Sequence, residues 1–70
     1  MNLTALTPER QIFSGSVKSV KVPGAGGQFE ILKDHAPIVA ALSEGEVRII
    51  NSDGEKTDFN IESGFVEVLN

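Results

Sequence analysis

The sequence predicts an all-β fold, a small β-sandwich, on three observations. Apolar and polar residues alternate in several short runs, as they do in strands that bury one face. Turn residues recur about every 8 to 12 positions, which is typical of a sandwich or barrel. The longest stretches without glycine or proline, 28–36 and 55–63, are shorter than an average helix. The 70 residues therefore predict one β-domain covering 1–70.

Three runs alternate regularly and predict ordinary strands with one buried face. They are 2–5, 46–49 and 58–62, and 65–69 is predicted as a last strand. The turn 52–54, with the sequence Ser-Asp-Gly, lies between the second and third runs. Because Asp-Gly between alternating runs is a strong hairpin signal, we expect these two strands to pair.

The segment 12–22 changes its apolar parity. Val17 shares one face with Phe13, whereas Val20 and Val22 lie on the other. A flat strand cannot direct both sets inward. Either a bulge near 18–19 resets the register, or the strand bends and serves two sheets in turn.

The run 38–42 is apolar on both faces. In a sandwich of this size only one face of a strand can point at the core. The outward face, Val39 with Ala41 or the reverse, must then meet either another part of the chain or a partner. The sequence leaves both alternatives open.

The glycine-rich segment 24–27 could cradle a phosphate through its backbone N–H groups. A phosphate loop ends in Gly-Lys-Ser or Gly-Lys-Thr and leads into a helix, whereas Gln28 and a predicted strand follow here. The segment therefore predicts a turn.

Composition excludes several classes of function. The net charge of −4 argues against nucleic acid, which calls for a basic surface. No cysteine and a single histidine argue against a metal site. No apolar run approaches the length of about 20 residues that crosses a bilayer, so we expect no direct membrane insertion.

No residue pattern predicts catalysis or a cofactor. Asp34 and His35 are neighbours in a turn, where their side chains seldom face each other, and no nucleophile accompanies them. The close acidic pairs at 44 and 46 and at 53 and 55 fit neither a glycosidase cleft nor a calcium loop. We expect a non-enzymatic chain without a bound cofactor.

Several short motifs follow one another along the whole chain. They are Leu6-Thr7-Pro8-Glu9, Ile12-Phe13-Ser14-Gly15-Ser16-Val17, Val22-Pro23-Gly24, Gly27-Gln28-Phe29-Glu30-Ile31-Leu32, His35-Ala36-Pro37, Ala41-Leu42-Ser43-Glu44-Gly45 and Gly64-Phe65-Val66-Glu67-Val68. Together they resemble the N-terminal β-sandwich domain of the ATP synthase epsilon chain, called the delta chain in mitochondria.

The resemblance implies a flattened sandwich of two five-stranded sheets, about ten short strands, with no catalysis of its own. It also implies a place in the central stalk (rotor) of a bacterial proton-translocating F-type synthase, peripheral to the cytoplasmic face of the inner membrane. The implied partners are the gamma chain and the c-ring. Implied contacts with the c-ring are the loops with Gly27, Gln28, His35, Ala36 and Pro37, and implied contacts with gamma are Thr7, Val39 and Leu42.

The sequence departs from the family pattern at three places. Gln28 stands where an acid is common, Glu30 where glycine is usual, and Lys33-Asp34 where Pro-Gly is usual. We also expect no C-terminal helical hairpin, since the chain ends at Asn70 just after the last predicted strand. The alternative is a free-standing β-sandwich that binds a peptide or small ligand, because a fold does not fix a function.

Overall fold

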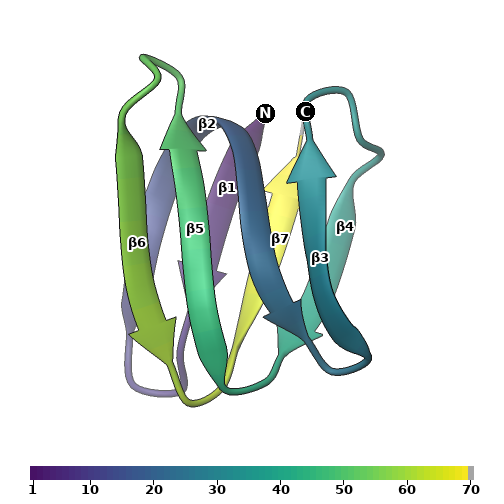
Figure 1. The fold of residues 1–70 in the computed structure, drawn as a ribbon, viewed down its shortest axis with the longest axis vertical. Coiled ribbons are helices and arrows are strands. Elements are labelled where there is room, and N and C mark those ends of the chain that lie inside the picture. The colour runs from purple at the N-terminus through teal and green to yellow at the C-terminus, as the bar shows by residue number, and fades with distance from the viewer. Residues whose placement is uncertain (70) are drawn as a thin grey trace.

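The computed structural model describes residues 1–69, which form β-strands and no helix, and so no helix that could cross a membrane (Figure 1). The strands are β1 (Asn2–Leu6), β2 (Gln11–Gly24), β3 (Gly27–Leu32), β4 (Ile38–Leu42), β5 (Gly45–Asn51), β6 (Lys56–Ile61) and β7 (Gly64–Leu69). Asn70 belongs to the predicted domain 1–70 but lies outside the described residues. The all-β prediction is confirmed, and the alternating runs fall within strands except for Glu62, which lies just beyond the end of β6.

All seven strands join one antiparallel hydrogen-bonded sheet, which β2 folds into two layers. The first half of β2 pairs with β1, and its second half pairs with β3 and β5. One layer then has the order β6–β5–β2–β3, and the other has the order β2–β1–β7–β4 (Figure 1). Ten strands in two five-stranded sheets were expected. The structure has fewer strands than expected, because the single strand β2 runs for 14 residues and takes part in both layers.

A β-bulge marks the place where β2 changes layers. On β2, Val17 pairs with Asn51 of β5, and Ser19 pairs with Ile50, the residue next to Asn51. Lys18 is therefore an extra residue on β2. An extra residue shifts the side-chain alternation by one position, so the valines on both sides of Lys18 face the core. The two alternatives predicted for this segment therefore occur together.

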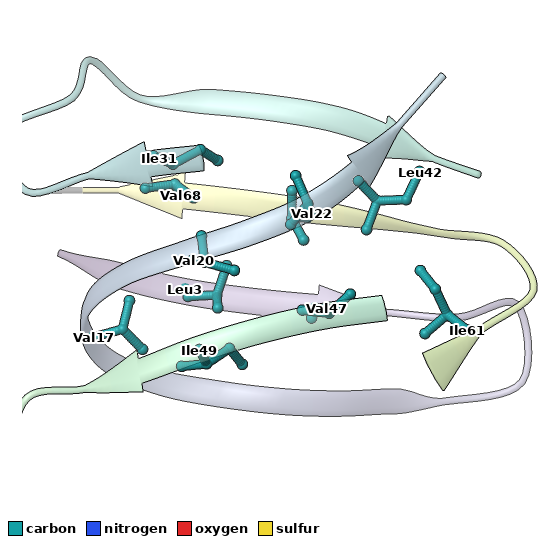
Figure 2. Close-up of a cluster of buried hydrophobic side chains, with 12 residues drawn as sticks. Leu3, Val17, Val20, Val22, Ile31, Leu42, Val47, Ile49, Ile61 and Val68 are labelled. Atoms are coloured by element: carbon teal, nitrogen blue, oxygen red, sulfur yellow. The ribbon is translucent and has the colours of Figure 1, made fainter. Parts of the chain in front are cut away.

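The core consists of aliphatic side chains that both layers contribute, and Figure 2 shows them gathered between the strands. The buried residues are Leu3, Ala5, Val17, Val20, Val22, Ile31, Leu42, Val47, Ile49, Ile61, Val66 and Val68. Each fully buried side chain of this kind contributes about 1.5–3 kcal/mol to the free energy of unfolding. Because the core is this small, the stability of the domain depends on every one of these side chains.

The strands run alternately up and down, so the turns gather at two ends of the sandwich (Figure 1). We name the lower end in Figure 1 the hairpin end. It holds the segments 7–10, 25–26, 43–44 and 62–63. Ser43 joins its segment to the end of β2, since both its backbone N–H and its hydroxyl donate to the Pro23 carbonyl, at 2.8 Å and 3.1 Å. We name the upper end, with 33–37 and 52–55, the corner end.

The segment 24–27 forms the hairpin turn between β2 and β3, as the sequence predicted. Gly24 pairs with Gly27 across the turn. Gly27 has a φ of 126°, a backbone conformation that residues with a Cβ rarely adopt. Gly26 does not have a positive φ, and a Cβ built on it meets no atom within 4 Å.

We predict that Gly27→Ala lowers the free energy of unfolding by about 1–3 kcal/mol, because alanine must be forced into this region of φ. The matched change Gly26→Ala in the same turn is expected to alter it by less than about 0.5 kcal/mol. Urea unfolding followed by circular dichroism measures both values. Equal effects of the two substitutions would contradict the geometry assigned to this turn.

Candidate docking face

The outer face of the β6–β5–β2–β3 layer is charged. Strand pairing places Lys21 between Glu30 on β3 and Arg48 on β5, and Arg48 opposite Asp58 on β6. The Arg48 Nε donates to the Glu46 Oε1 at 2.7 Å. These groups are solvated or paired with one another, so this face is suited to water.

The outer face of the other layer is polar where β2 and the start of β1 form it, at Asn2, Thr4, Ser14 and Ser16. Large apolar side chains gather on β4, β7 and the end of β1, and we name this surface the apolar face. Its large side chains are Leu6, Val39, Phe65 and Leu69, which are 38%, 69%, 53% and 48% exposed, and Ala41 is exposed among them. Single exposed apolar residues are ordinary, whereas a contiguous group of them marks an interaction surface.

The register of β1, β7 and β4 makes this group contiguous. Phe65 on the central strand β7 lies opposite Leu6 on β1 and opposite Ala41 on β4. Side chains directly opposite on one face are about 5 Å apart at their Cβ atoms. These three residues therefore form a row across the layer, and Val39 and Leu69 extend it toward the corner end.

The structure resolves which face of β4 points outward. Val39 and Ala41 are exposed, and no other part of residues 1–69 covers them, so the partner alternative gains support. Leu42, by contrast, is only 7% exposed and belongs to the core. The expectation that its side chain meets gamma is corrected, because parity on β4 turns Leu42 inward as it turns Val39 outward.

The two loops expected at one c-ring contact lie at opposite ends of the sandwich. Gln28, beside Gly27, pairs with Pro23 at the hairpin end, whereas Leu32 pairs with Ser19 and leads into the corner that holds His35. The strand β3 separates them, at about 3.3 Å per residue. One flat partner surface at an end of the domain would not reach both loops.

The corner 33–37 is a turn built on Asp34. The His35 N–H donates to the Leu32 carbonyl at 3.1 Å, and Asp34 has a φ of 72°. Aspartate tolerates this left-handed region better than most residues. The His35 Nδ1 lies 2.6 Å from the Ala36 carbonyl oxygen, so this ring nitrogen donates, since a carbonyl only accepts. Ala36 and Pro37 are exposed beside it.

Thr7 lies at the hairpin end and fixes the turn between β1 and β2. Its N–H and its hydroxyl both donate to the Arg10 carbonyl, at 2.8 Å and 3.2 Å. The hydroxyl also accepts the Arg10 N–H at 3.3 Å. The half-buried Thr7 side chain thus makes its hydrogen bonds within its own turn.

An open groove of about 570 Å³ runs beside this turn, between the first half of β2 and β6. Ile12, Phe59 and Ile61 line it, with Glu9, Arg10 and Glu62 among its polar residues. Within residues 1–69 no polar or charged side chain is buried. The groove therefore lacks the converging, desolvated polar groups that orient a small ligand.

Comparison with known proteins identifies the family. The profile of the ATP synthase delta/epsilon chain β-sandwich domain matches residues 1–70. This chain belongs to that family. The ATP synthase epsilon chain of Chlorobium limicola is 50% identical over 66 residues, which cover 94% of this chain and 75% of the relative. The epsilon chain of Caulobacter vibrioides is 42% identical over 69 residues, covering 97% and 78%.

Relatives in this family differ in length. The epsilon chain of Protochlamydia amoebophila is 48% identical over 66 residues, but these cover only 45% of that protein. The chain thus spans about three quarters of the Chlorobium and Caulobacter relatives and less than half of the Protochlamydia one.

Sequence reasoning did not single out Leu6, Phe65 and Leu69 as surface residues. Phe65 and Leu69 carried a signal that could have found them. The last strand is apolar at four of the five positions 65–69, and Glu67 is the exception. A strand that is apolar on both faces needs a cover on both, by the same argument applied to 38–42.

We predict that Val39→Asp and Leu42→Asp have different effects on stability, because the first lies on the exposed face of β4 and the second on its buried face. Val39→Asp is expected to change the free energy of unfolding by less than about 1 kcal/mol, because the new charge stays in water. Leu42→Asp is expected to cost more than about 4 kcal/mol, because it places an unpaired charge in the core. Thermal unfolding by circular dichroism compares the two. Loss of the fold in both variants would show that Val39 is core.

Proposed function

We propose that this chain is a non-catalytic component of the central stalk of a proton-translocating F-type ATP synthase, and that it links the gamma chain to the c-ring. The observation that carries the proposal is the apolar face, which puts large apolar side chains in water on a domain whose own core is small. Membership of the delta/epsilon family and relatives named ATP synthase epsilon chain support the assignment to the synthase.

The apolar face and the corner beside it are the proposed contact with gamma. The strand β4 begins directly after Pro37, so the segment 35–37 continues the surface that Val39 and Ala41 begin. Burying these side chains against another protein removes apolar area from water, which is the main driving force of association. His35, Ala36 and Pro37 are therefore reassigned from the c-ring to the edge of the gamma contact.

The hairpin end is the proposed contact with the c-ring. It holds Gly27, Gln28 and Thr7, and it also holds three acids, Glu9, Glu44 and Glu62, with Arg10 as a cation among them. Gln28 lacks the charge that the family commonly has at this position. The neighbouring acids supply negative charge at the same end, so the end can still meet polar or basic loops of the ring.

This arrangement assigns the domain a mechanical task. A coupling element must hold one partner along a face and another at an end, and must not deform between them. A fully antiparallel sandwich with an aliphatic core meets that requirement, because packed interiors transmit strain rather than absorb it. The chain would lie peripherally at the cytoplasmic face of the bacterial inner membrane, held there through the complex.

We predict that the chain binds the gamma chain of its own organism and that Val39→Asp weakens this binding at least about tenfold, since docking would strip water from the new charge. The control Lys56→Asp alters charge on the opposite face and is expected to change the dissociation constant by less than about twofold. Isothermal titration calorimetry measures all three proteins. No binding by the unmodified chain at about 10 µM would count decisively against the proposed function.

We predict that single cysteines report which end meets which partner. The chain has no cysteine, so Gln28→Cys and His35→Cys each introduce a unique thiol. A short thiol-reactive bifunctional cross-linker applied to the assembled synthase should join Gln28→Cys to a c subunit and His35→Cys to gamma. Mass spectrometry of the adducts identifies the partners. Adducts with the two partners exchanged would reverse the proposed orientation.

A further inference from the structure

Glu67 occupies the centre of the apolar face. It lies on β7, the middle strand of the three, with Thr4 opposite it on β1 and Val39 opposite it on β4. Phe65 and Leu69, two residues to either side, point outward with it because side chains alternate along a strand. Its carboxylate is therefore surrounded by the residues that a docked partner would cover.

Glu67 is the only charged residue in these three strands. The sequences of β1, β4 and β7 contain no lysine or arginine and no other acid. Within residues 1–69 the one ion pair joins Arg48 to Glu46, on the charged face of the other layer. The Glu67 carboxylate is exposed, and water rather than a cation of this chain solvates it.

Docking of a partner on the apolar face changes the environment of this carboxylate. Cover over Val39, Phe65 and Leu69 excludes water from the space between them, and a carboxylate left there without a counter-charge is strongly disfavoured. A partner that binds this face must therefore either leave a gap that keeps water around the Glu67 carboxylate or place a cation against it. The apolar side chains of Val39, Phe65 and Leu69 border the carboxylate on three sides and Thr4 borders it on the fourth. The three apolar neighbours favour the second arrangement, because a gap would leave those side chains uncovered.

We propose that Glu67 is the specificity-determining residue of the apolar face, and that the partner on this face places a lysine or arginine against its carboxylate. The inference rests on the proposed function, in which that partner is the gamma chain. A single charge on an otherwise apolar surface fixes the position and rotation of the partner, which apolar contacts alone define poorly.

The same carboxylate disfavours a second copy of this chain as the occupant. A second apolar face offers only its own Glu67 and no cation. Face-to-face association of two copies would bury two unpaired carboxylates, which costs affinity rather than adding to it. Glu67 thus selects for a basic partner and against the chain itself.

The test uses Glu67→Gln and Glu67→Leu, with Glu30→Gln on the charged face as the matched control. Calorimetry with the cognate gamma chain measures each dissociation constant, and sedimentation velocity measures self-association. We expect Glu67→Gln and Glu67→Leu each to weaken gamma binding at least about tenfold, with Glu67→Leu also self-associating. Glu30→Gln should stay within about twofold. Thermal unfolding confirms that each variant is folded, which the exposure of both glutamates favours.

The possible failures are distinguishable. If the unmodified chain binds gamma and both Glu67 variants bind as tightly or more tightly, the carboxylate only keeps the free face soluble and this inference is overturned, while the proposed function stands. If the unmodified chain does not bind gamma, the proposed function falls and the inference falls with it.

Discussion

The shared strand β2 is the constraint on which the rest of the structure depends. Fourteen residues cross from one layer to the other, and the extra residue Lys18 lets their side chains face the core on both sides of the crossing. Without that extra residue one half of the strand would turn its valines to water. The two layers would then have no common core, and no outer face would have a defined composition.

The fold could be predicted from sequence because the signals were local. Alternation marked the strands, and the parity change between Val17 and Val20 indicated either a bulge or a bend between two sheets. The number of strands could not be predicted, because nothing local distinguishes one strand that bends from two that are separate. That distinction depends on which neighbours each half of β2 finds in space.

The candidate site was only partly predictable for the same reason. Val39 was identified by its place in a doubly apolar run, but Leu42 was assigned to the wrong side because its neighbour Ala41, which has the opposite parity, is also apolar. Gln28 and His35 were placed together because the resemblance implied one contact for both loops. Gln28 lies near the start of the six-residue strand β3 and His35 lies beyond its end, so the two residues are at opposite ends of the domain. The apolar row of Leu6, Phe65 and Ala41 depends on pairing between distant strands, which no window of sequence contains.

The position of β7 between β1 and β4 also determines when the apolar face can form during synthesis of the chain. The apolar face needs the middle strand, and residues 64–69 are the last of the seven strands to leave the ribosome. Until then β1 and β4 have no strand to join them, and the apolar face is not a continuous surface. Long-range pairing of this kind is slow to form. Under the proposed function, the contact with gamma would therefore form only after β7 has paired with both strands.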